Sequence, residues 1–330
     1  MNVLVTGATG FLGRKVALHL ASIGYNVTGT GRNQLVGDSL SNSGIQFKAC
    51  HLENRDDIMM LCENQHFVIH CGALSSPWGK YNDFYQANVI GTKNVIDGCK
   101  KWNVSRLVHV STPSLYFHYD ERKDVKEDDS LPEKFVNHYA KTKFLAEKEV
   151  DQAFIDGLST ITIRPRALFG PGDQAIFPRL IKVCEKGMFP KVGSGDVVID
   201  MTYIDNAVDA ILLCMNSGSE TLGQKYNITN GERVQLYSMI DTVMKRLGRS
   251  FTYKQISFKK AFHLATSLEY VSKLLLFRKE PLLTRYTVSV LSQSQTLSIE
   301  KAKSELGYKP AVSVEDGTKE FVDWWKSHVH

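Results

Sequence analysis

Tyr139 and Lys143 lie four residues apart in the run His138-Tyr139-Ala140-Lys141-Thr142-Lys143. Residues at this spacing share one face of a helix, so the ammonium group can lie beside the phenol. A nearby cation favours phenolate and lowers the pKa of tyrosine, which is about 10 in a free side chain. The pair therefore predicts a phenol that acts as an acid near neutral pH.

An N-terminal loop, Thr6–Gly13, carries Gly7, Gly10 and Gly13 at the spacing GxxGxxG. It follows a strand-like run and opens a helix-like run, which is the context in which this pattern binds a dinucleotide. Glycines let the backbone turn tightly and approach a diphosphate, and the unpaired N–H groups at the helix start attract its charge. The alternative is an ordinary tight turn. A second strand in register favours dinucleotide binding.

The end of the second expected strand, Thr28–Asn33, bears on the choice of cofactor. A carboxylate there would accept a hydrogen bond from the ribose 2′-hydroxyl of NAD(H), whereas the Arg32 guanidinium suits the 2′-phosphate of NADP(H). NADP(H) is therefore favoured, and NAD(H) stays open because Arg32 can also be a solvated loop residue. Arg14 is a second candidate for the phosphate.

These residues need a scaffold, and strand-like and helix-like runs alternate through the first half of the chain. Such alternation is typical of βαβ units in a parallel, doubly wound sheet. The expected strands are 2–5, 26–30, 46–50, 67–70, 106–111 and 160–164. The expected helices are 12–23, 84–101, 139–154, 203–215, 258–277 and 314–326.

Pro and Gly concentrate after the last of these strands, which indicates that the chain leaves the nucleotide domain there. We expect an α/β fold with a Rossmann-type doubly wound parallel sheet. The dinucleotide-binding domain would span 1–165, with 202–222 returning to it. A smaller, mixed α/β C-terminal lobe over 166–201 and 223–330 would bind the substrate.

Composition narrows the functions further. The net charge of +5 in 330 residues is small and the charged residues are scattered, which argues against a nucleic acid partner. The six cysteines form no CxxC pair and have no histidine at zinc-ligand spacing, so we expect reduced thiols and no metal site. Residues 2–5 already have the pattern of a buried strand, and no apolar run reaches spanning length. A cytoplasmic location is therefore expected.

Together the motifs resemble the extended short-chain dehydrogenase/reductases over nearly the whole chain. The likeness rests on their order: Thr6–Gly13, Asn88–Asn94, Val110-Ser111-Thr112, Tyr139–Lys143, and Arg164-Pro165 followed by Gly170-Pro171-Gly172. The resemblance implies hydride transfer between a nicotinamide cofactor and a carbonyl carbon. Tyr139 would then donate a proton to the forming alkoxide.

The same resemblance implies roles for further residues. Thr112, or its neighbour Ser111, would hydrogen-bond the substrate oxygen. Lys143 would hold the nicotinamide ribose, and Asn88 would order the site or its water relay. Cofactor contacts are expected at Gly7, Thr9, Gly10, Phe11, Leu12, Gly13, Arg32, Leu52, Cys71, Gly72, Ala73, Tyr139, Lys143 and Pro165. The family pattern is broken at His51, where many relatives carry Asp near the adenine. We interpret His51, His70, His109 and His138 as structural.

Other departures bear on the substrate. Pro113-Ser114 follow Thr112, where sugar dehydratases carry an Asp-Glu acid–base pair. Ala167 and Ile199 stand where nucleotide-sugar enzymes commonly carry an Asn and an Arg that grip the sugar diphosphate. The grip on a diphosphate is therefore missing from these positions.

Segments 75–79, 280–286 and 301–310 resemble the 3β-hydroxysteroid dehydrogenase branch of the family. That branch includes sterol-4α-carboxylate dehydrogenases and bacterial 2-alkyl-3-oxoalkanoate reductases, and the bacterial type fits better. The resemblance implies a bulky apolar ketone or alcohol, a 2-alkyl-3-oxoalkanoate or a 3β-hydroxysteroid-like compound. Arg166 is a candidate for binding a substrate carboxylate, and Trp78 is a candidate wall of the pocket.

Two other functions stay open. An NAD-dependent nucleotide-sugar 4-epimerase or dehydratase would use the same Thr112, Tyr139 and Lys143, with Arg166 and Arg179 compensating for the missing diphosphate grip. A non-catalytic dinucleotide sensor with a protein partner is the other alternative. Sensors of this fold typically lack the Tyr–Lys pair, so its presence argues against that use.

Two helical regions allow more than one interpretation. The apolar stretch 258–277, interleaved with lysines, is either a core-facing amphipathic helix or a substrate wall that can touch a membrane surface as a lid. The helices over 84–101 and 139–154 either form a homodimer contact, as in relatives, or simply cover the sheet. We favour a homodimer.

Overall fold

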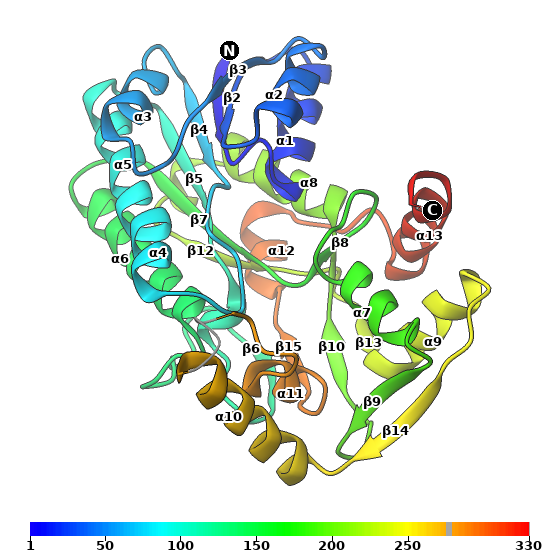
Figure 1. The fold of residues 1–330 in the computed structure, drawn as a ribbon. Helices are drawn as coiled ribbons and strands as arrows, with labels where there is room; N and C mark the ends of the chain where they lie inside the picture. The colour runs from blue at the N-terminus through cyan, green and yellow to red at the C-terminus, as the bar shows by residue number, and fades with distance from the viewer. Residues whose placement is uncertain (275–278, 330) are drawn as a thin grey trace.

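The structure, a computed structural model, describes residues 1–274 and 279–329. In this part of the chain, a seven-stranded parallel sheet has the spatial order β12-β7-β5-β4-β1-β2-β3 (Figure 1). Its strands are β1 (Asn2–Thr6), β2 (Asn26–Gly31), β3 (Gln46–Ala49), β4 (Phe67–His70), β5 (Arg106–Val110), β7 (Thr160–Pro165) and β12 (Lys225–Ile228). The order reverses between β1 and β4, so the sheet is doubly wound and the predicted fold class is confirmed.

The central strands form because their residues are buried on both faces. Val3 and Val5 of β1 enter one apolar core, whereas Leu4 between them enters the core on the other face. β7 is buried at every position, as expected for a parallel strand covered on both sides. Of the seven strands of this sheet, only the edge strand β3 is largely exposed.

Helices cover both faces of this sheet (Figure 1). On one face, α1 (Phe11–Ser22) packs against α8 (Ile204–Asn216). On the other face, α5 (Gly91–Lys101) packs between α3 (Arg55–Leu61) and α6 (His138–Ile155). This leaves the carboxyl ends of the strands as the open edge, where parallel α/β proteins bind ligands.

The helix expected over 84–101 has a more irregular course. It starts earlier, at α4 (Tyr81–Phe84), and passes through a π-helical turn, Tyr85–Ile90, before α5. Single π turns interrupt helices mostly at functional positions. This one carries Asn88 in a buried position.

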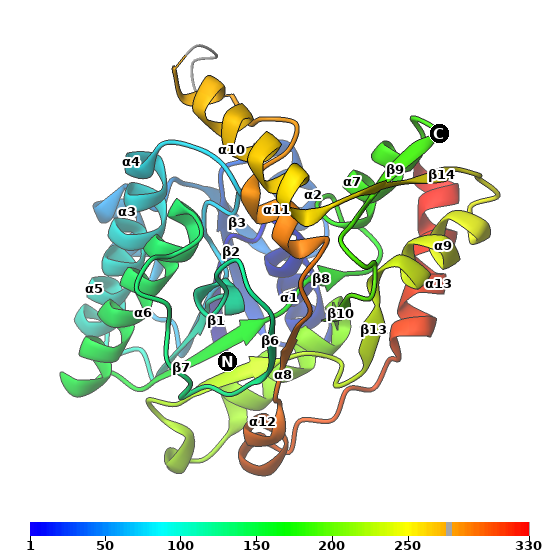
Figure 2. The same cartoon turned by 90° about the horizontal axis from the view of Figure 1, so that it is seen from below.

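A second lobe lies beside the open edge of the large sheet (Figure 2). Its main sheet is mixed and has the order β13-β10-β15-β6, with strands β6 (Arg122–Val125), β10 (Val198–Asp200), β13 (Arg233–Gln235) and β15 (Gln295–Leu297). Two further pairs are β8 (Leu168–Phe169) with β11 (Thr202–Tyr203), and β9 (Met188–Val192) with β14 (Thr252–Ile256). The helices of the second lobe and its borders are α7 (Phe177–Cys184), α9 (Leu236–Arg246), α10 (Phe258–Leu274), α11 (Arg285–Val290), α12 (Glu300–Leu306) and α13 (Val314–His328). The remaining helix of the large lobe, α2 (Gln34–Ser41), lies beside β3.

The boundaries between the two lobes differ from the expected ones at two places. β12 pairs with β7 through Lys225 and Thr162, so the chain that returns at residue 202 contributes to the large sheet as far as Ile228. Conversely, β6 lies within the first 165 residues of the sequence but pairs with β15 and so belongs to the sheet of the second lobe. Both strands are short and pair with partners far away in the sequence, which local patterns do not reveal.

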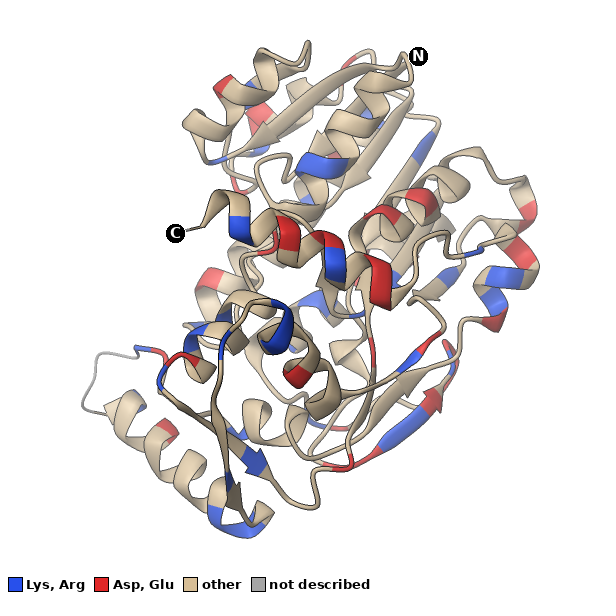
Figure 3. Ribbon diagram, turned by 90° about the vertical axis from the view of Figure 1, so that its right-hand side faces the viewer, with Lys and Arg blue, Asp and Glu red and all other residues tan. Residues whose placement is uncertain are grey.

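The outer surface carries both signs of charge. Figure 3 shows basic and acidic residues interspersed along the ribbon, including along α13. The helix expected over 258–277 is described as α10 up to Leu274, and its last three residues lie outside the described part of the chain. Within residues 1–274 and 279–329, every helix is too short or too polar to cross a membrane.

Candidate active site

The glycine loop joins β1 to α1 in a conformation that only glycine tolerates. Gly7 has a φ of 68°, in the left-handed region. A Cβ atom on Gly13 would lie 2.2 Å from the carbonyl oxygen of Gly7. α1 begins after Gly10 with no side-chain cap and no acidic residue in its first turn. Its first N–H groups are therefore available to an anion, which fits the diphosphate of a dinucleotide.

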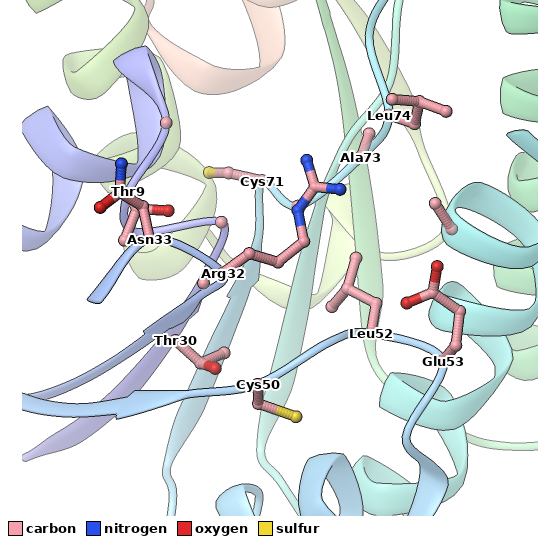
Figure 4. A pocket seen from close by; sticks show the side chains of 15 residues that line it. Thr9, Thr30, Arg32, Asn33, Cys50, Leu52, Glu53, Cys71, Ala73 and Leu74 are labelled. Atoms are coloured by element: carbon pink, nitrogen blue, oxygen red, sulfur yellow. The ribbon is translucent and has the colours of Figure 1, made fainter. Parts of the chain in front are cut away.

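A cavity of about 320 Å³ extends from this loop across the ends of β2, β3 and β4 (Figure 4). Eight predicted cofactor residues line it: Gly7, Thr9, Gly10, Arg32, Leu52, Cys71, Gly72 and Ala73. The prediction missed Thr30, Gly31, Asn33, Cys50, Glu53, Leu74 and Ala87. All of these except Ala87 lie within three residues of a predicted contact, so the strand ends themselves were the available signal.

The far end of the cavity holds groups of both charges. Figure 4 shows the exposed Arg32 side chain extending over the cavity from the end of β2, while Leu52 and Glu53 approach from the segment after β3. Cys50 and Cys71 add no charge, because burial raises the pKa of their thiols to about 11 and about 12. The cavity thus has the Arg32 guanidinium, which can bind a phosphate, and the Glu53 carboxylate, which can accept a hydrogen bond from a hydroxyl group.

Tyr139 stands in the first turn of α6, where Asn137 caps the helix. The Asn137 side chain accepts a hydrogen bond of 2.8 Å from the Ala140 N–H. Thr112 follows β5 and caps the short 3₁₀ turn that starts at Pro113. The Thr112 and Ser75 side chains lie close enough to the Tyr139 phenol to affect its pKa, so the structure brings the predicted Tyr and Thr together. Ser75 was not predicted as a site residue.

The predicted lowering of the Tyr139 pKa is wrong for this structure. Burial raises this pKa, and it stays raised although the hydrogen bonds from Ser75 and Thr112 lower it. The Lys143 ammonium is turned toward β5, with Nζ 2.7 Å from the Val110 carbonyl oxygen and 3.2 Å from His109 Nε2. Burial lowers the pKa of Lys143 to about 8. Near neutral pH, Tyr139 is therefore a protonated phenol, and Lys143 is the group of the pair that titrates.

Asn88 fastens the loop after β4 to α6. Its Oδ1 accepts from the Leu74 N–H at 2.7 Å, and its Nδ2 donates to the Leu74 carbonyl at 3.2 Å and to Thr142 Oγ1 at 3.0 Å. Both amide hydrogens are used, which leaves one lone pair of Oδ1 for a water molecule. The contacts order the loop that carries Ser75 and hold the residue next to Lys143.

Two of the predicted substrate residues, Ser111 and Arg166, are buried. Ser111 is buried and its N–H donates to the Ile163 carbonyl at 2.7 Å, which places it within the sheet. Arg166 is also buried, donates to Gln295 Oε1 at 2.7 Å and stacks on the Phe117 ring at 4.3 Å. Among the described residues, its Nε has no hydrogen-bond partner. A buried donor of this kind needs a ligand or water.

Of the predicted cofactor contacts, Pro165 ends β7 and pairs with Ile228 in the sheet. Phe11, in the first turn of α1, lies beside Gly172, where an added Cβ would be 3.7 Å from its ring. The glycine–proline motif thus packs on the nucleotide loop.

A second cavity, the α10 groove, has a volume of about 870 Å³ and lies between α10, the start of α6 and the loop after β4. Its aromatic lining consists of Trp78, Tyr81, Phe84, Phe135 and Tyr286. Its basic lining consists of Lys80, Lys134, Lys141, Lys273 and Arg285. The groove adjoins the first turn of α6, because His138 lines it, and Tyr286 of its lining lies close enough to Tyr139 to affect the pKa of the phenol.

A buried ion pair supports the site from behind. Arg164 at the end of β7 binds Glu147 of α6 through two hydrogen bonds, of 2.6 and 2.9 Å. It also donates to the Tyr116 hydroxyl, which in turn donates to Asn227 of β12 at 3.0 Å. This network fixes the helix that carries Tyr139 and Lys143 to two strands of the sheet.

Comparison with known proteins agrees with this geometry. The model of the 3-beta hydroxysteroid dehydrogenase/isomerase family matches residues 4–259. The chain is 35% identical to the 2-alkyl-3-oxoalkanoate reductase of Stenotrophomonas maltophilia (strain K279a), over 97% of this chain and 98% of the relative. It is 29% identical to the decarboxylating sterol-4-alpha-carboxylate 3-dehydrogenase of Mus musculus, over 96% of this chain and 89% of the relative.

Among solved structures, the UDP-glucuronic acid 4-epimerase of Bacillus cereus in complex with NAD has a TM-score of 0.80 and covers 100% of both chains. At 23% identity this likeness shows a common fold. The family match spans the glycine loop, Thr112, Tyr139 and the second lobe as far as the start of α10. The chain therefore belongs to the 3-beta hydroxysteroid dehydrogenase/isomerase family and is an oxidoreductase of the extended short-chain dehydrogenase/reductase type.

Proposed function

We propose that the protein reduces the ketone of a bulky apolar 3-oxo acid, a 2-alkyl-3-oxoalkanoate or a related 3β-hydroxysteroid-like compound, with NADP(H). The α10 groove carries this proposal. It places a space of about 870 Å³ with an aromatic lining beside the helix turn that carries Tyr139, and a space of this size accommodates an apolar ligand. The names of the two relatives, a 2-alkyl-3-oxoalkanoate reductase and a sterol carboxylate dehydrogenase, support the same class.

In this reaction, the residues of this chain would have distinct roles. The nicotinamide cofactor supplies a hydride when it is bound. The glycine loop would hold its diphosphate, Arg32 its 2′-phosphate and Lys143 its ribose. Tyr139, a protonated phenol, would give its proton to the carbonyl oxygen of the substrate. Thr112 would hydrogen-bond the same oxygen.

Arg166 is our proposed partner of the substrate carboxylate. Its guanidinium is buried, has a free Nε among the described residues and interacts electrostatically with Tyr286 of the groove. A buried guanidinium with an unused donor binds a carboxylate well, because both groups gain a charge-assisted hydrogen bond. The alkyl groups of the substrate would then extend along the aromatic lining of the groove.

A nucleotide-sugar substrate is the alternative. Arg179, a candidate to replace the missing diphosphate grip, instead forms an ion pair of 3.3 Å with Glu280. Purified protein should oxidise NADPH with long-chain 2-alkyl-3-oxoalkanoates and should not convert or bind UDP-sugars below about millimolar concentration. Turnover of UDP-sugars without any response to 3-oxo acids would replace the proposal with an epimerase.

The variant Tyr139→Phe tests the proton donor. It should lower the rate of NADPH oxidation by roughly 10²–10⁴-fold, because general acid catalysis contributes about this much, while the Kd of NADPH stays unchanged. Tyr270→Phe is the matched control, since Tyr270 is 67% exposed on α10. Near-full activity of Tyr139→Phe would refute the assigned role.

A further inference from the structure

Two histidines lie beneath the Tyr139–Lys143 pair. His70 and His109 occupy paired positions on β4 and β5, and their ring centroids are 5.3 Å apart. Both side chains are fully buried. The sequence suggested structural roles for both, but their hydrogen bonds distinguish them.

His70 is a satisfied core residue. Its Nδ1 is 2.7 Å from Thr6 Oγ1 and its Nε2 is 2.9 Å from Thr92 Oγ1, so both ring nitrogens have a hydroxyl partner. His109 differs, because its Nε2 faces Lys143 Nζ at 3.2 Å and its Nδ1 has no partner among the described residues. A ring that served only to fill the core would not need to leave a buried nitrogen unpaired.

The charge states of Lys143 and His109 determine which of the two donates in the hydrogen bond between them. The pKa of His109 lies well below its ordinary value, because the ring is buried and because the Lys143 charge and His70 are close. The imidazole is therefore neutral. It must accept at Nε2 from the ammonium and carry its own proton on Nδ1, since an ammonium has only donors.

The three N–H donors of Lys143 can then be accounted for. One donates to the Val110 carbonyl at 2.7 Å and one to His109 Nε2. The third is left for the active-site side, where the proposed function places the cofactor ribose. With two of its three donors held by β5, the ammonium cannot rotate freely.

We infer that His109 is a positioning residue, whose neutral imidazole holds the Lys143 ammonium so that its remaining N–H points at the cofactor ribose. This rests on the proposed function, in which Lys143 binds that ribose. The other titratable groups around Lys143 do not replace the acceptor. Glu147 is bound to Arg164, Cys71 is a neutral thiol, and His70 is occupied by two threonines.

The first test detects the hydrogen bond between Lys143 and His109 without measuring enzyme activity. In protein with ¹⁵N-labelled histidine, the spectrum of His109 should show the Nδ1–H tautomer at pH 7, and its Nε2 resonance should shift as Lys143 titrates near pH 8. Lys143→Met should abolish that shift. An Nε2–H tautomer at pH 7, or a resonance that is insensitive to Lys143→Met, would overturn the inference whether or not the protein reduces 3-oxo acids.

The second test uses the pH profile. Loss of an acceptor disfavours the charged form of Lys143, so His109→Phe should move the alkaline fall of kcat/KM toward acid by about one pH unit. It should also weaken NADPH binding several-fold. His109→Gln, whose amide oxygen can accept, should recover most of both properties.

The matched control is His70→Gln, a change in the same buried pair at a ring whose hydrogen bonds go to Thr6 and Thr92 and not to Lys143. It should lower the melting temperature and leave the alkaline fall in place. If His109→Phe lowers only the melting temperature, with an unchanged pH profile and an unchanged Kd of NADPH, then His109 is merely structural. A wild-type enzyme inactive on every 3-oxo acid would instead refute the proposed function, and the histidine spectrum would still decide the inference.

Discussion

Tyr139 and Lys143 are neighbours, yet burial shifts their pKa values in opposite directions. Burial favours the neutral form of each side chain, which raises the pKa of the phenol and lowers that of the ammonium to about 8. Between pH 6 and 9 only the lysine changes its charge. The phenol stays a proton donor over this range, and Lys143 determines how well the cofactor is held.

The pH dependence of ketone reduction follows from this difference. A base with a lowered pKa is charged below that pKa, so kcat/KM should be level near pH 7 and should fall as the pH rises through about 8. Lys143→Arg should have lower activity but no fall at this pH, because arginine stays charged. A fall only near pH 10 in the wild type would indicate that the phenol titrates instead.

The choice of cofactor depends on a single exposed arginine. Arg32→Asp should raise the Kd of NADPH by roughly 10–100-fold, since it removes a charge-assisted hydrogen bond and adds repulsion. The Kd of NADH should change little, because its 2′-hydroxyl can use a carboxylate. Fluorescence titration measures both constants. Arg55→Asp, the same change outside the cavity, is the control, and equal losses for NADPH and NADH would exclude the assignment.

At the scale of elements, the strands of the large sheet could be predicted to within one residue at each end, apart from β12. The central strands, such as β1 and β7, are buried on both faces and therefore have burial patterns that local sequence reveals. The strands of the second lobe could not be predicted. Arg122 of β6, for example, pairs with Gln295 of β15, a contact between distant and mostly polar segments.

The same distinction applies to the site. The glycine loop, Thr112 and Tyr139 were predicted because each belongs to a motif formed by residues close together in the sequence. Ser75 and Tyr286 were missed, since they approach Tyr139 from a loop and from α11 through contacts that only the folded chain creates. The deep pairing of Lys143 with His109 also depends on register between α6 and β5, which no local pattern specifies.

The Glu147–Arg164 pair should be essential for the attachment of α6. Both side chains are nearly inaccessible, at 2% and 4% exposure. Glu147→Gln leaves a buried guanidinium without its counter-charge, so the free energy of unfolding at pH 7 should fall by about 3–5 kcal/mol. Urea denaturation measures this. Glu149→Gln, which removes the surface pair with Lys93, should cost less than about 1 kcal/mol.

The pH dependence of this pair has a definite sign. Burial alone would raise the pKa of Glu147, but the charge and hydrogen bonds of Arg164, together with Ser111 and Lys225, outweigh burial and the pKa is lowered. A carboxyl group with a lowered folded-state pKa stabilises the protein above its unfolded-state pKa and loses this effect as the pH falls through the folded value. The difference between wild type and Glu147→Gln should therefore shrink in acid. A constant difference down to pH 3 would contradict the ion-pair explanation.

At the scale of the whole molecule, the two lobes supply different chemistry to one point. The large lobe presents the glycine loop, Thr112 and Tyr139 at the open edge of its sheet, and the second lobe adds Arg166's partner Gln295 and the groove wall formed by α10 and α11. Residues of both lobes, such as His138 and Tyr286, line the α10 groove. Substrate selection is therefore expected to depend on how firmly α10 is held.

The Glu269 carboxylate fastens α10 to α11. Glu269 is 6% exposed and accepts from the Arg285 backbone N–H at 2.7 Å and from its Nε at 2.9 Å. Glu269→Gln would lose the charge and one of these acceptors, so the groove wall should loosen while the nucleotide cavity stays intact. We expect kcat/KM for long-chain 2-alkyl-3-oxoalkanoates to fall about tenfold, the loss of about one charged hydrogen bond, with a smaller effect on short-chain analogues and none on the Kd of NADPH.

The control for this prediction lies in the same lobe. Glu280 forms an exposed ion pair with Arg179, at 43% and 59% exposure, so Glu280→Gln should leave the ratio of long-chain to short-chain kcat/KM unchanged. Comparing the two variants over a series of chain lengths separates groove geometry from net charge, which changes equally in both. If Glu269→Gln lowered kcat/KM equally for all chain lengths, the alkyl groups would bind elsewhere and the groove would not select the substrate.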